Sequence, residues 1–81
     1  MNTMDHNLAY ACVGYGVVRA LSKRLADAPF TVPAALVLKE PDPVAFCIEA
    51  MAVEHPDWVE RVSKATRNFI DSKLREEAAR A

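Results

Sequence analysis

The stretch "DPVAFCIEAMAVEHP", residues 42–56, decides the fold of this 81-residue chain. Asp42 followed by Pro43 is a strong helix start, because aspartate caps free backbone amides and proline fits the first helical turn. Pro56 ends the helix at residue 55. The segment is apolar on two nearly opposite faces, formed by Val44, Cys47, Ile48 and Met51 and by Phe46, Ala50 and Val53. A helix of this kind must be covered on both sides, so we expect 43–55 to be the central helix, sandwiched by two others.

The segment that follows predicts a second helix over 57–75. Its apolar residues recur at helical spacing: Trp58, Val62, Ala65 and Phe69. The pairs Glu60–Lys64 and Asp71–Arg75 stand four residues apart in the order that stabilises a helix. The apolar stripe stops after Leu74, so we expect residues 76–81 to fray.

The first 26 residues predict a third helix, over 5–26, with Asp5 as its cap. One apolar face consists of Leu8, Ala11, Tyr15, Val18 and Leu25. A second face has only small side chains, at Ala9, Cys12, Gly16 and Ala20. Such a face allows a neighbouring backbone to approach closely, which offsets the cost of glycine in a helix, about 1 kcal/mol relative to alanine. A bend, or a break between two short helices, is the alternative.

The tetrapeptide Val13-Gly14-Tyr15-Gly16 resembles the selectivity filter of potassium channels and also a phosphate-binding loop. A filter needs flanking membrane helices of about 20 apolar residues, and the longest uncharged runs here are about a dozen residues. The string Gly14-x-Gly16-x-x-Arg19 lacks the third glycine of a dinucleotide-binding loop and follows no strand pattern. Packed helix is therefore the interpretation we prefer.

Four prolines, at positions 29, 33, 41 and 43, interrupt the segment between the first two long helices. It supports at most two helical turns, over 32–39, with Thr31 as cap and Pro33 in the first turn. The run 34–38 is also compatible with one short strand, but a lone strand has no partner in this chain. The fold class predicted is therefore all-α: a single domain, residues 1–81, with three main helices and one short helical turn. We expect the core to be dominated by Trp58, Phe69, Val62, Ile48, Met51, Phe46, Leu25, Val18 and Tyr15.

Charge and cysteine content narrow the classes of function. The net charge of −1 gives no overall basic field for nucleic acid, although residues 40–57 carry five acids and no base, and residues 58–75 carry five bases. Two cysteines, Cys12 and Cys47, are too few for a disulfide framework and favour reduced buried thiols in a cytoplasmic protein. No basic, apolar leader precedes Ala9-Tyr10-Ala11, and we expect no membrane span.

The motif "VSKAT", Val62 to Thr66, resembles the opening of the recognition helix in helix-turn-helix domains of the lac-repressor type. The resemblance covers five residues. It implies that four polar residues reach phosphates and base edges: Ser63, Lys64, Arg67 and Asn68. Arg61 stands where the turn glycine of that family is expected, and Glu60 and Asp71 share the exposed arc with the bases. A dimeric DNA-binding regulator is therefore the alternative function.

The sequence gives little support to a metal site or to a catalytic thiol. His6, Cys12, Cys47 and His55 are the only soft metal ligands, and their spacings match no known metal motif. A nucleophile built from Cys47, with His55 as base, would place the thiol among apolar neighbours that hold it protonated. We therefore expect no catalytic residue, no metal and no cofactor.

The remaining interpretation is a surface that binds another protein. The chain has more apolar helix surface than a few short helices can hide from one another, and surplus of this kind marks a partner or a homodimer. The leading prediction is a non-enzymatic binding module, an inhibitor or adaptor of a larger protein assembly, comparable on size alone with phage-encoded inhibitors such as anti-CRISPR proteins. Its charged rim would consist of Glu40, Asp42, Glu49, Glu54, Arg61, Lys64, Arg67, Asn68 and Arg75.

Overall fold

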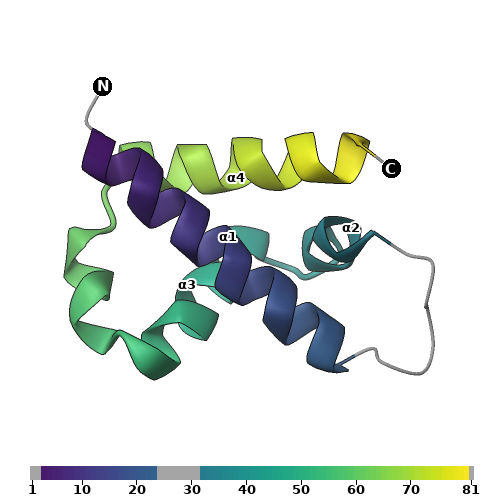
Figure 1. Cartoon of the computed structure of the whole chain (residues 1–81), viewed down its shortest axis with the longest axis horizontal. Coiled ribbons are helices and arrows are strands. Elements are labelled where there is room, and N and C mark those ends of the chain that lie inside the picture. Colours follow the sequence, from purple (N-terminus) through teal and green to yellow (C-terminus); the bar gives the residue numbers. More distant parts are fainter. Residues whose placement is uncertain (1–2, 24–31, 81) are drawn as a thin grey trace.

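The computed structural model describes residues 3–23 and 32–80, and it confirms the all-α class (Figure 1). The helices are α1 (Thr3–Lys23), α2 (Pro33–Leu38), α3 (Pro43–Glu54), the 3-10 helix η1 (Pro56–Arg61) and α4 (Lys64–Ala79). The described residues include no strand, so 34–38 is helix and not the alternative strand. Residues 24–26 and the expected cap Thr31 lie outside the described residues, and Val32 occupies the N-cap position of α2.

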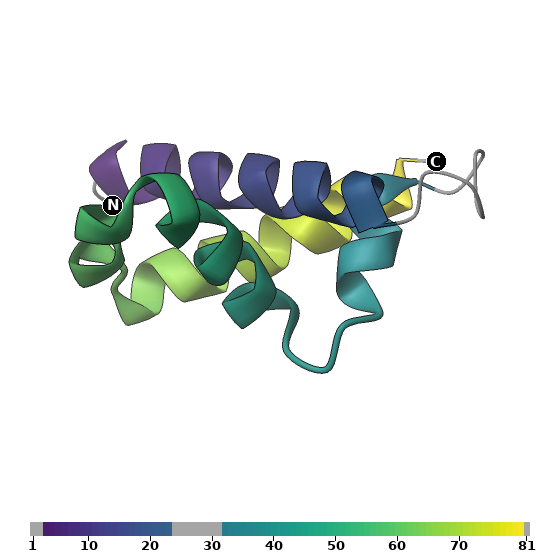
Figure 2. The same ribbon diagram turned by 90° about the horizontal axis from the view of Figure 1, so that it is seen from below.

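Helix α1, and not α3, is the helix against which the other helices pack. In Figure 2, α1 runs along one edge of the molecule, and the other helices lie on its opposite side. It packs most extensively against both α3 and α4 and also contacts α2, whereas α3 and α4 meet less extensively. The expectation that α3 is sandwiched between the two long helices is therefore wrong. Its second apolar face is covered only in part, since Val53 is 83% exposed.

The face of small side chains on α1 packs inward, as the sequence predicts. Ala9, Cys12, Gly16 and Ala20 are all buried. A methyl group added at Gly16 would overlap Cys47 Sγ and lie 3.2 Å from Cys47 Cα. The helix is continuous through both glycines, so neither a bend nor a break is needed. Close approach of α1 to α3 therefore accounts for the glycine at position 16.

The predicted boundaries of α3 are confirmed, because the Asp42 side chain accepts a hydrogen bond from the Ala45 amide (3.1 Å) and the helix ends at Glu54. The predicted helix 57–75 is wrong at its start. Residues 56–61 form the 3-10 helix η1, and α4 begins after Ser63. Ser63 and Thr66 cap α4 reciprocally, each side chain accepting from the other residue's amide (3.1 and 3.3 Å).

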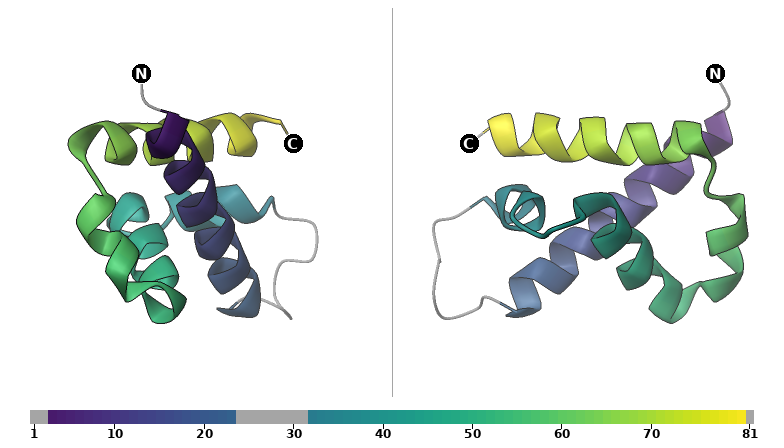
Figure 3. Two further views of the ribbon diagram at one scale, coloured as in Figure 1. Left: turned by 60° about the vertical axis from the view of Figure 1, so that its left-hand side comes forward. Right: turned by 180° about the vertical axis from the view of Figure 1, so that it is seen from behind.

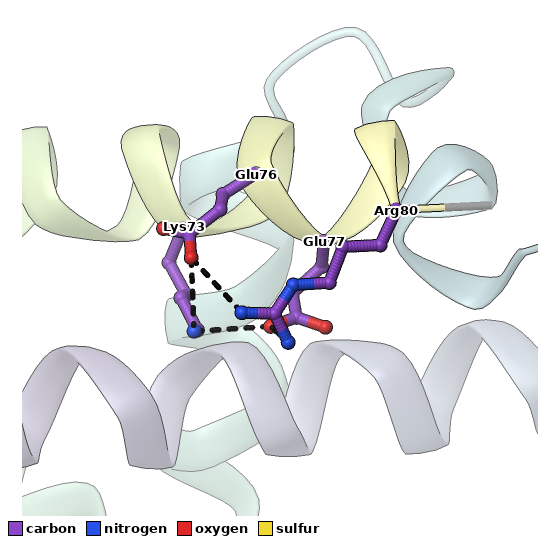
Figure 4. A network of polar contacts seen from close by, with 4 residues as sticks. All are labelled: Lys73, Glu76, Glu77 and Arg80. Carbon is purple, nitrogen blue, oxygen red and sulfur yellow. Dashed lines mark hydrogen bonds and ion pairs between the residues drawn. The ribbon is translucent and has the colours of Figure 1, made fainter.

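Helix α4 also continues beyond residue 75, where the sequence predicts fraying, to Ala79. Four charged residues hold this last turn through ion pairs (Figure 4): Lys73, Glu76, Glu77 and Arg80. Because these pairs lie three and four residues apart on one helix, they stabilise it without help from an apolar stripe.

The side chains at the centre of the core are smaller than predicted. Six side chains of the hydrophobic core are fully buried, at Cys12, Val37, Cys47, Met51, Ile70 and Leu74. Of the predicted core residues, Phe46, Ile48 and Met51 are buried, and Tyr15, Trp58, Val62 and Phe69 are half-buried. Val18 is 62% exposed, so its assignment to the core is wrong. Leu25 lies outside the described residues.

The N-terminal part of α1 is joined to the start of α4. Asp5 lies within the first turn of α1 and is not its cap; its carboxylate accepts a hydrogen bond (3.1 Å) from the buried Thr66 hydroxyl. The His6 and Phe69 rings stack beside this bond, with centroids 4.3 Å apart. The hydroxyl of Thr66 is thus satisfied in a site without solvent, which is the condition for burying a polar group at low cost.

Candidate protein-binding surface

An apolar face of α1 points away from the rest of the molecule. Tyr10, Val18 and Leu21 are 54%, 62% and 42% exposed, and Gly14 is exposed between them. With the half-buried Val17, these residues follow the spacing of one helix face. We call this surface the α1 outer face: Tyr10, Gly14, Val17, Val18 and Leu21. Figure 3 shows α1 in front of the other helices in the left view and behind them in the right view, so one side of this helix is not covered by another helix.

The α1 outer face carries no charged residue. Each Asp, Lys and Arg of α1 contacts another part of the molecule. Besides Asp5, which contacts Thr66, these are Arg19, 3.7 Å from Glu49, and Lys23, 4.0 Å from Glu40. A helix face that meets only water is normally polar or charged. The α1 outer face is therefore the candidate binding surface of the described residues.

A groove of about 370 Å³ adjoins this face. Its walls come from three helices and the residue before α2: Tyr10, Val13, Gly14, Val17, Val32, Pro33, Ala34, Lys73 and Glu77. A smaller hollow of about 100 Å³ lies on the other side of Tyr10 and Lys73 and is lined by His6, Ala9, Phe69, Ser72 and Glu76 as well. The two hollows share Tyr10 and Lys73, so both lie where α1 meets α4.

The charged residues on the rim of the groove neutralise one another. Lys73 Nζ lies 3.0 Å from Glu77 Oε1 (Figure 4). It also lies 4.8 Å from the centroid of the Tyr10 ring. The hydrogen bond from Lys73 lowers the pKa of the Glu77 carboxyl, and the same bond raises the pKa of the Lys73 ammonium. Both groups are thus charged over the physiological range and paired, and the rim has no net charge to attract an acidic or basic ligand.

The four acidic residues predicted to form a charged rim are scattered and internally engaged. Glu40 and Glu49 pair with Lys23 and Arg19, and Asp42 caps α3. Glu54 accepts a hydrogen bond from the Tyr15 hydroxyl (2.9 Å), which raises the pKa of that phenol. Each of the four carboxylates therefore has a partner within the chain: Glu49 and Glu54 contact α1, Glu40 pairs with the end of α1, and Asp42 caps its own helix.

The predicted basic residues lie together in part. Arg61, Lys64, Arg67 and Asn68 are exposed around the start of α4, and within the described part of the chain none of the three bases forms an ion pair. Arg75 is paired with Asp71 (3.0 Å). Residues 55–63, which include η1, separate α3 from α4. A helix-turn-helix uses a turn of about 3–4 residues, so α3 and α4 do not have that geometry.

The thiols lie in the core and not in a site. Cys12 Sγ contacts Met51 Sδ (3.3 Å), and neither Cys12 nor Cys47 is exposed to solvent. Burial raises the pKa of Cys12 to about 11 and that of Cys47 to about 12. The His55 ring stacks on Trp58, with centroids 3.7 Å apart. Among the described residues, no three His, Cys, Asp or Glu side chains gather closely enough to hold a metal ion.

Sequence reasoning missed the α1 outer face because it assigned Val18 to the core and left Tyr10 and Leu21 unassigned. One signal was present: on the arc centred on Gly14, no charge occurs between Asn7 and Ser22. Comparisons with protein-family models, with curated proteins and with solved structures found no match. In the described segments, no helix combines the length and the apolar character needed to cross a bilayer.

Proposed function

We propose that this chain is a small protein-binding module. The α1 outer face and the adjoining groove take up an apolar helical segment of a larger protein, and the chain acts on that protein as an inhibitor or an adaptor. One observation carries the proposal: the most exposed face of the longest helix is apolar and has no charged residue. The paired charges on the rim favour a partner segment that is itself uncharged where it meets the groove.

The total exposed surface of the molecule is ordinary for its size. The accessible surface of the molecule, 5175 Å², is close to the roughly 4800 Å² expected of a compact protein of this mass. Full burial of one large apolar side chain contributes about 1.5–3 kcal/mol. Tyr10, Val18 and Leu21 are about half exposed, so covering them contributes roughly 1 kcal/mol each, and the groove wall adds to this. A bound module would act by occupying a surface that the larger protein needs.

Affinity capture tests this function. The purified chain is immobilised, exposed to a lysate of its source cells, and compared with a Tyr10→Ser, Val18→Ser double variant. We expect a protein that the wild type retains and the double variant loses. The matched control is the double variant Lys64→Ala, Arg67→Ala, which leaves the apolar face intact and should retain the same protein. Capture that depends on Lys64 and Arg67, and not on Tyr10 and Val18, would contradict the proposal.

Binding to DNA is the second candidate, and the exposed bases around the start of α4 favour it. A module held by Arg61, Lys64 and Arg67 would bind duplex DNA with an affinity that falls steeply with salt, and removal of two of these bases would reduce the salt slope by about 2. Fluorescence anisotropy with a labelled duplex measures the slope directly. A variant of Tyr10 should bind such a duplex as well as the wild type does, which separates the two functions.

A further inference from the structure

We draw no further inference here: the strongest candidate, the groove of about 370 Å³ between α1, α2 and α4 together with the apolar α1 outer face beside it, belongs to the surface already described, and nothing in residues 3–23 and 32–80, which the structure describes, shows what covers it.

Discussion

Gly14 and Gly16 lie two residues apart in α1, and alanine at these two positions should change the free energy of unfolding in opposite directions. At Gly14 a methyl group meets nothing within 4 Å, so alanine contributes only its better helix propensity. We expect the Gly14→Ala variant to be about 1 kcal/mol more stable. This corresponds to a rise in Tm of about 4–8 °C for a domain of this size.

At Gly16 the same methyl group would overlap Cys47 Sγ and approach Cys47 Cα and Cβ to 3.2 Å. Overpacking of a core costs about 1–3 kcal/mol, and the gain in helix propensity offsets about 1 kcal/mol of this. We therefore expect Gly16→Ala to lower the free energy of unfolding by roughly 1 kcal/mol. Because Cys47 is fully buried, its side chain has little room to turn away.

Urea denaturation followed by circular dichroism measures both changes. A double-mutant cycle identifies the cause: Cys47→Ala removes the overlapping sulfur, so Gly16→Ala should be less harmful in that background by about 1 kcal/mol. The reasoning is refuted if Gly16→Ala is as stable as the wild type, or if the cycle shows no coupling between the two positions. A destabilised Gly14→Ala would show that α1 packs differently.

Three further predictions concern the cap, the thiols and the phenol. Ser63→Ala should lower the free energy of unfolding by about 1 kcal/mol in urea titrations, because α4 loses its capping side chain. The raised pKa values of Cys12 and Cys47 imply stability that is complete below pH 9 and is lost as the pH rises from 9 to about 12, by roughly 3 kcal/mol for Cys12 and roughly 4 kcal/mol for Cys47; removing both cysteines should flatten that part of a pH–stability curve. Glu54→Gln should lower the pKa of Tyr15, followed by tyrosinate absorbance, and a pKa equal to that of the wild type would exclude the hydrogen bond as its cause.

The sequence predicted those parts of the fold that depend only on residues close together in the chain. Asp42 and Pro43 start α3 because capping needs only neighbouring residues. The small side chains of α1 identified its inward face for a similar reason, since only such a face allows close packing. The start of α4 was missed because apolar periodicity continues through η1, whereas the cap depends on Thr66 accepting from the Ser63 amide. The usual capping box has glutamate or glutamine at the third helical position, so a search for that pattern does not find the bond made by Thr66.

The candidate surface was less predictable than the fold. Glu49 and Glu54 read as exposed charges in the sequence, but their partners Arg19 and Tyr15 lie on another helix and are known only once α1 and α3 are packed. Val18 could not be assigned by periodicity, because α1 has apolar residues on nearly every side. Which side is covered depends on the fit between Gly16 and Cys47, and that fit is a property of the tertiary structure.

The bond between Asp5 and Thr66 joins residues that are 61 positions apart. During translation α1 and α3 are made before α4, so the part of α1 that α4 covers has no partner until the last helix is made. Contacts between such distant segments delay folding, because a long loop must close first. We expect the nascent chain to stay open until α4 has left the ribosome. In that interval the α4-facing side of α1 is bare, and chaperones have their best opportunity to bind it.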